Sequence, residues 1–213
     1  TRYKLVTGVQ TCALPIYRLR GAFSKMVRML ICYLAIYLNS RLLSVHLSGF
    51  IDEPQLLVLQ ISFFLILVYA LKLERTCCNW KFRLKWLIFL FLLMIFHVSL
   101  LNHLLFFQPA NQEILLSIQR KVSVICFYLF LLNAGILEEY FYRKLLWNNF
   151  QIGILQIGVT SILFSLSHNP EQFSSFFIYF GMGICLGIMK SRTDLLGSIL
   201  LHAIWNTFVF VTT

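Results

Sequence analysis

The sequence predicts an all-α, polytopic membrane helix bundle with about seven transmembrane helices. Of its 213 residues, 59% are hydrophobic and only 12% are charged, which lies far outside the composition of an ordinary soluble domain. Apolar runs of roughly the 20 residues that a bilayer span requires recur between charges and clusters of Pro, Gly and Asn. No internal repeat or low-complexity linker divides the chain, so we expect a single transmembrane domain.

Seven apolar segments define the expected helices. The first is the least apolar, because Arg28 and Asn39 shorten its hydrophobic run. The second follows Glu53-Pro54, residues that favour a helix start, and the third ends at Gln108-Pro109. In chain order the segments are approximately 26–43, 55–73, 84–107, 122–150, 153–168, 173–189 and 195–211.

Residues 1–16 are treated separately from the rest of the chain. The run at positions 6–16 resembles the conceptual translation of a common sequencing-library adapter, so residues 1–16 are interpreted as an artefact and excluded from the fold prediction. The predicted domain therefore covers residues 17–213. A difference between the nucleotide sequence and the adapter across these codons would contradict this interpretation.

The basic residues predict membrane topology rather than nucleic-acid binding. The net charge is +10, but Lys and Arg cluster beside the ends of apolar runs, where they serve as topology signals and contacts for anionic lipids. After residue 16, thirteen of them lie beside connections on one side of the membrane and three on the other. The positive-inside rule then places the N-terminus in the cytoplasm of a multi-pass cell-membrane protein. Trp80, Trp86 and Trp147 fall at the same boundary, as an aromatic belt would.

Three ionisable residues interrupt the segment 122–150. Glu139 and Arg143 are four apart on a helix, so they share a face in the favourable acid-before-base order. Glu138 points about 100° away and has no local partner. A charge inside a bilayer costs about 2.5–3.5 kcal/mol on insertion scales, and such residues are functional by default. We therefore expect Glu139 and Arg143 to satisfy each other while Glu138 serves a site shared with other helices.

Two later segments carry polar pairs that could complete this site. Phe164 and His168 are four apart, as are His202 and Asn206, so each pair lies along one helical face. Together with Glu138 these residues supply a general-base candidate, two imidazoles and an amide, a combination typical of an active site. The alternatives are a structural ion-pair cluster, a helix-end histidine and interhelical hydrogen bonds.

The depths of the two histidines constrain the helix between them. His168 ends the segment 153–168, whereas His202 lies about eight residues into the segment 195–211. If the two imidazoles are to meet, the connecting segment 173–189 should be short, tilted or broken near Gly181–Gly183. Gly181, Gly183 and Gly187 otherwise form a small-residue stripe that favours close helix packing.

At these three pairs the sequence resembles the CPBP family of intramembrane proteases, which includes the CAAX prenyl-protein endopeptidases and proteins linked to bacteriocin processing and self-immunity. The family motifs are EExxxR, FxxxH and HxxxN or HxxxD. They stand here, in the family order and on separate hydrophobic segments, as Glu138-Glu139-x-x-x-Arg143, Phe164-x-x-x-His168 and His202-x-x-x-Asn206. The resemblance covers approximately residues 122–211, which form the expected catalytic core.

The resemblance implies hydrolysis of a peptide bond by an activated water. Glu138 would be the general base, and His168 would help to bind and orient the water. His202 and Asn206 would stabilise the oxyanion of the tetrahedral intermediate. The implied substrate is a peptide or a lipid-modified protein, in contact with membrane lipids and without nucleic acid.

The remaining motif residues are supporting. Glu139 and Arg143 would hold their helix in place, with Phe164 as the apolar member of its pair. One departure from the family pattern follows the motif arginine, where Lys144 stands in place of the frequent glycine. The segments before residue 122 match no specific pattern, so the resemblance does not identify the substrate.

Two alternatives accompany this hypothesis. No cofactor is favoured, but zinc held by Glu138, His168 and His202 would give a metalloprotease instead of a glutamic protease. The three residues come from three segments and lack an HExxH framework. The alternative function is a non-catalytic membrane protein, either an immunity or scaffold protein or a small transporter, in which the same residues form a structural polar network.

Overall fold

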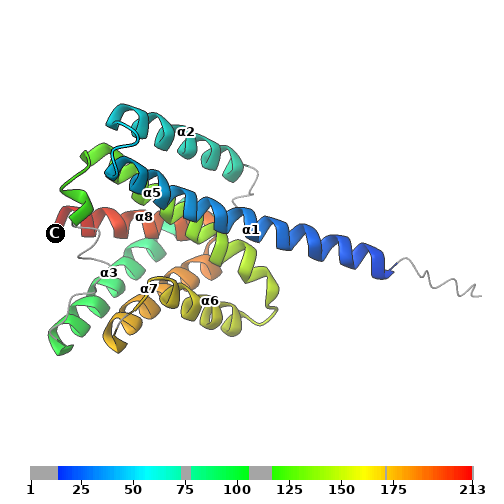
Figure 1. The fold of residues 1–213 in the computed structure, drawn as a ribbon. Helices are drawn as coiled ribbons and strands as arrows, with labels where there is room; N and C mark the ends of the chain where they lie inside the picture. Colours follow the sequence, from blue (N-terminus) through cyan, green and yellow to red (C-terminus); the bar gives the residue numbers. More distant parts are fainter. Residues whose placement is uncertain (1–13, 73–77, 106–116, 171, 213) are drawn as a thin grey trace, which may run out of the picture.

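The computed structural model describes residues 14–72, 78–105, 117–170 and 172–212, and these residues form helices and no strands (Figure 1). This confirms the predicted all-α class. Each predicted segment corresponds to one helical stretch, and 122–150 contains three elements in succession. The elements are α1 (Leu14–Leu47), α2 (Glu53–Lys72), α3 (Trp80–Leu105), α5 (Val124–Tyr140), η1 (Phe141–Leu146), η2 (Trp147–Asn149), α6 (Gly153–Ser167), α7 (Phe173–Arg192) and α8 (Leu195–Thr212).

Two predictions fall partly or wholly outside the described residues. Of the suspected artefact at residues 1–16, residues 1–13 are not described, and α1 begins at Leu14. The predicted end of the third segment at Gln108-Pro109 is also not described, and α3 is followed up to Leu105.

Helices α5 and α8 lie at the centre of the bundle. They pack against each other, α1 and α2 contact α5, and α3 and α7 contact α8 (Figure 1). Helix α6 lies against α7. The segments that carry the three motif pairs therefore converge on the middle of the molecule, while α1, α2 and α3 supply its outer helices.

Six of the described helical stretches are long and apolar enough to cross a membrane, which supports a multi-pass membrane protein. The seventh, α6, has only 15 residues. At about 1.5 Å per residue it is roughly 23 Å long, less than the hydrocarbon thickness of about 30 Å. His168, which caps the C-terminal end of α6, is therefore expected to lie short of the membrane boundary.

The segment 173–189 is neither short nor broken, as two of the three predicted alternatives had it, and its tilt stays a prediction. Helix α7 runs without interruption from Phe173 to Arg192. Its glycines serve close packing instead: a Cβ on Gly183 would lie 3.0 Å from the Cα of Ser161, and one on Gly181 would overlap the His97 ring. Helix α6 has 15 residues and ends just before His168, in agreement with the predicted segment 153–168.

Replacing Gly183 by alanine is expected to destabilise the protein by about 1–3 kcal/mol, because the new methyl group would press on the backbone of Ser161. Chemical unfolding in detergent would measure the change. Gly158→Ala on α6 is the matched control, since a Cβ there meets nothing within 4 Å. Equal unfolding free energies for the two variants would contradict close packing of α6 on α7.

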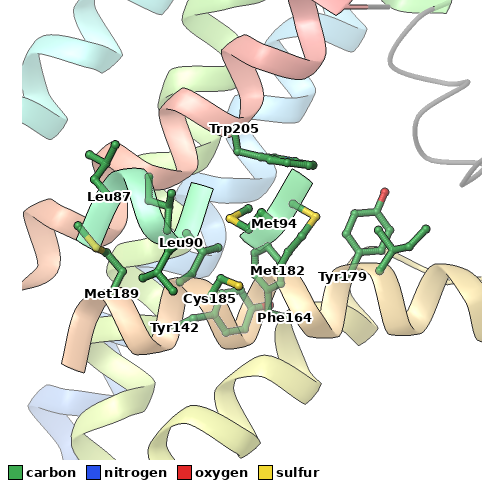
Figure 2. Packing of buried hydrophobic residues seen from close by; sticks show 13 residues of the cluster. Leu87, Leu90, Met94, Tyr142, Phe164, Tyr179, Met182, Cys185, Met189 and Trp205 are labelled. Carbon is green, nitrogen blue, oxygen red and sulfur yellow. The ribbon is translucent and has the colours of Figure 1, made fainter. Parts of the chain in front are cut away.

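The largest hydrophobic cluster lies between α3, α6, α7 and α8 and beside the polar motif residues. Figure 2 shows Leu90 and Met94 of α3 close to Met182 and Met189 of α7, and all four are buried. Phe164, the apolar member of the second motif pair, is fully buried in the same cluster. This packing fixes the helices on which the polar side chains stand.

Buried amides attach α1 and α2 to α5. The Asn133 side chain donates a hydrogen bond to the Gln60 side-chain oxygen at 2.6 Å, and the Asn39 amide donates to the backbone oxygen of Phe130 at 3.1 Å. All three amide residues are almost completely buried. Interhelical amide hydrogen bonds of this kind hold membrane helices together, so the outer helices fix the position of α5 without the motif residues.

Candidate active site

The first motif spans a change of helix type. Glu138 and Glu139 lie in the last turn of α5, whereas Arg143 lies in η1, a π-helix that follows directly. A π-helix has a wider turn than an α-helix and occurs frequently at functional sites. Sequence spacing predicted the shared face of Glu139 and Arg143, but not this widened turn.

Glu139 is the most highly bonded residue of the site. Its side chain has 0% exposure and faces the Arg143 guanidinium, with 3.5 Å between Glu139 Oε2 and Arg143 Nε. Ser198 donates its hydroxyl hydrogen to the same carboxylate. His202 Nδ1 lies 3.1 Å from Glu139 Oε1. The predicted pairing of Glu139 with Arg143 is therefore present, and the carboxylate also binds two residues of α8.

Arg143 connects α5 to α6 and α7. Its guanidinium donates one hydrogen bond to the Thr160 hydroxyl and another, of 2.9 Å, to the backbone oxygen of Gly183. The side chain is fully buried. One arginine thus joins three helical elements, which the rigid fork of a guanidinium permits and a single ammonium would not.

The imidazole of His202 has a defined orientation. A carboxylate can only accept hydrogen bonds, so Nδ1 carries the hydrogen shared with Glu139. Nε2 then faces the other carboxylate, 3.9 Å from Glu138 Oε2. The Glu138 side chain is 20% exposed, and its buried Oε2 makes no hydrogen bond with any described residue. The two adjacent glutamates therefore contact opposite nitrogens of one ring.

Asn206 lies one turn beyond His202 on α8. Its amide nitrogen is 3.5 Å from the backbone oxygen of Leu131 on α5. Gly135 lies beneath both residues: a Cβ there would be 3.5 Å from the His202 ring and 3.7 Å from Asn206 Nδ2. Glu138 and His202 therefore face each other between α5 and α8, and Asn206 lies one turn further along α8, beside Leu131.

His168 contacts the same Phe164 ring as His202 does. Its own ring centroid is 4.5 Å from that of Phe164, which in turn is 5.9 Å from that of His202. His168 Nδ1 lies 2.8 Å from the Phe164 backbone oxygen, and the ring stacks on Tyr179 at 4.3 Å. Among the described residues, no hydrogen bond or ion pair joins His168 to Glu138.

The end of α6 explains the placement of His168. Asn169 has a positive φ of 46°, a conformation in which Asn commonly ends helices, and Pro170 follows it. His168 is the C-cap residue, so its ring folds back onto the last turn and contacts Phe164. Asn169 and Pro170 thereby end α6 and place His168 at its C-terminal end.

Three residues of the site were not predicted from the sequence. Ser198 precedes His202 by four residues and Thr160 precedes Phe164 by four, so both lie on a motif face and the helical spacing could have identified them. Tyr179 stacks on His168 from α7, and its sequence context gave no signal. All three orient motif residues rather than extend the motifs.

The proposed zinc ligands do not form a three-ligand site. Among the described residues, no group of three or more His, Cys, Asp or Glu is arranged to hold a metal ion. Glu138 and His202 face each other at 3.9 Å, and both histidine rings contact the Phe164 ring.

The fold and these contacts define a polytopic helical membrane protein with a buried cluster of ionisable side chains between its central helices. Residues 120–208 match the Rce1-like family model, described as type II CAAX prenyl endopeptidase Rce1-like. The matched segment contains all three motifs, and it supports the predicted resemblance to the CPBP or CAAX protease family. The family supports an intramembrane endopeptidase that acts on a membrane-embedded protein. Searches of curated proteins and of solved structures found no match.

Proposed function

We propose that this protein hydrolyses a peptide bond with a water molecule activated by Glu138, with His202 and Asn206 as the oxyanion site. The observation that carries the proposal is the orientation of His202. Glu139 holds its Nδ1 at 3.1 Å, and its Nε2 faces Glu138 Oε2 at 3.9 Å beside Asn206. This pairing supports Glu138 as the general base, and Asn206, one turn along α8 from His202, would supply the amide donor.

The reaction balances with these groups alone. Glu138 accepts a proton from water as the water oxygen bonds to the carbonyl carbon, and the carbonyl oxygen becomes an oxyanion. Asn206 Nδ2 donates to that oxyanion, and so does His202 Nε2 when the ring carries both protons. The carbon–nitrogen bond then breaks, and Glu138 returns the proton to the departing amine. The products are a new carboxyl terminus and a new amino terminus.

His168 has a secondary role in this proposal. Its Nδ1 is engaged by the Phe164 backbone oxygen, so the neutral ring presents Nε2 as an acceptor. An acceptor can hold one O–H of the attacking water while Glu138 takes the other proton. The position of His168 at the end of the short helix α6 supports this assignment.

The orientation in the membrane follows from the basic residues. The end of the bundle where α2 and α7 terminate carries most of them, so we propose that this end and the N-terminus face the cytoplasm. The substrate proposed for the site is a peptide or lipid-modified protein segment that enters from the bilayer. A cysteine-labelling assay on intact cells or inverted vesicles would test the orientation.

Isotope labelling tests the proposed reaction directly. The purified protein in liposomes would be incubated in ¹⁸O-labelled water with fluorescence-quenched peptides, both lipid-modified and unmodified. We expect cleavage with one labelled oxygen in the new carboxyl terminus. A folded protein that cuts none of these peptides, while a matched family protease cuts them, would favour the non-catalytic alternative.

Ser198→Ala is expected to lower kcat by about 10–100-fold, because Glu139 would lose one of the hydrogen bonds that orient it toward His202. Ser198 acts through Glu139, so it is a positioning residue. Ser198→Thr retains the hydroxyl and should restore most of the rate. A loss of stability in Ser198→Ala without a change in kcat would show that the hydroxyl is only structural.

A further inference from the structure

A hollow of about 290 Å³ lies between α3, α6 and α7, outside the candidate active site. Its walls are mostly apolar, and its polar residues are Ser191 and Arg192 in the last turn of α7. This is the end at which α3 begins and α7 ends. The apolar walls include Trp86 and Phe89 of α3, Ile157 of α6 and Ile188 of α7.

The guanidinium at the mouth of the hollow is held in place but not neutralised by the protein. Arg192 is exposed, and its guanidinium carbon lies 5.3 Å from the centroid of the Trp86 ring, a cation–π contact. The nearest acidic residue along the chain, Asp194, is instead bound by Arg83 at 2.6 Å and caps α8 through Gly197 N. No carboxylate among the described residues pairs with Arg192, so its charge is available to an external anion.

The apolar wall extends from the mouth along the surface of α3. Phe89 is 56% exposed, and Leu93, one turn further along the same face, is 38% exposed. Phe96 continues this face with 62% exposure. Such a strip, which runs from a charged helix end toward the middle of a membrane span, fits a hydrocarbon chain. The hollow therefore offers a site for an anion joined to a long apolar chain.

The surrounding charge distinguishes between classes of lipid. Lys85, adjacent to Trp86, is exposed, and the only carboxylate close in sequence to Arg192 is already neutralised by Arg83. A zwitterionic headgroup would bring its own cation into this positive region, whereas an anionic headgroup would not. Basic pockets between transmembrane helices are typical sites for anionic lipid headgroups.

We propose that the hollow between α3, α6 and α7 is a binding site for an anionic glycerophospholipid. The lipid phosphate binds Arg192 and Ser191, and one acyl chain lies along Phe89 and Leu93. This site is separate from the cleavage site between α5 and α8 and does not depend on the proposed reaction.

The test is the thermal unfolding of the delipidated full-length protein in detergent, titrated with phosphatidylglycerol. We expect a saturable rise in Tm, with half-saturation at about fivefold higher lipid in Arg192→Gln, the effect of one basic residue at an anionic surface. Arg28→Gln removes an equally exposed charge from α1, outside the hollow, and should leave the half-saturation unchanged. Phe89→Gln should also weaken the effect, although the net charge stays the same.

Three outcomes would overturn the proposal. The first is an identical titration for Arg192→Gln and Arg28→Gln, which would indicate non-specific charge attraction. The second is the same stabilisation by inorganic phosphate or phosphatidylcholine, which would remove the need for an anionic lipid. The third is a wild-type response in Phe89→Gln, which would exclude the acyl chain from the assigned wall.

Discussion

Replacing Glu138 by glutamine is expected to lower the rate of peptide hydrolysis by about 10²–10⁴-fold while the protein remains folded. The amide has nearly the same size as the carboxylate but cannot accept a proton from water. Glu138 is partly exposed, and its Oε2 makes no hydrogen bond within the described residues, so little of the bundle depends on its charge. Initial rates in liposomes and the Tm in detergent would be measured on the same preparation.

Glu53→Gln is the matched control for this experiment. Glu53 is exposed, and it accepts a hydrogen bond from the backbone nitrogen of Ser123 at 3.1 Å, which an amide oxygen can still accept. It lies in the first turn of α2, away from the three motif pairs. The control should cleave at the wild-type rate. If Glu138→Gln did so as well, the general base would have to be another residue.

The sequence predicted contacts within one helix better than contacts between helices. Helical spacing placed Glu139 and Arg143 on one face, and both occur as an ion pair. From the spacing, Arg143 was the one predicted partner of Glu139. In the structure Glu139 also binds Ser198 and His202 of α8. Contacts within one helix follow from the roughly 3.6 residues of an α-helical turn. Contacts between helices depend on how the helices pack, and the local sequence does not predict this.

The error at α7 has a similar physical origin. Gly181 and Gly183 allow either a helix break or a close approach of two helices, and the sequence alone does not distinguish these uses. The structure shows the second, with Gly183 against Ser161 and Gly181 against His97. The length of α6, in contrast, agrees with the sequence, because Asn169-Pro170 ends that helix directly after His168.

Arg143→Met is expected to destabilise the protein by about 3–5 kcal/mol, the cost of leaving one partner of a buried ion pair without the other. Glu139 would keep its contacts with Ser198 and His202 but lose the adjacent positive charge. Thr160 and the Gly183 backbone oxygen would also lose a donor. Denaturant titration in mixed micelles would measure the loss. The conservative variant Arg143→Lys should recover only part of it, because one ammonium cannot reach all three groups.

Two further variants separate the buried pair from a general effect of losing an arginine. Arg41→Met is the control, because Arg41 is exposed and its guanidinium contacts Tyr37 of the same helix, so the change should be below about 1 kcal/mol. The double variant Glu139→Gln with Arg143→Met removes both charges, and it should be less destabilised than the sum of the two single variants. An additive double variant would mean that the two charges do not stabilise each other. In that case Arg143 would hold α6 and α7 through Thr160 and Gly183 alone, and the Glu139 contact with His202 would not depend on it.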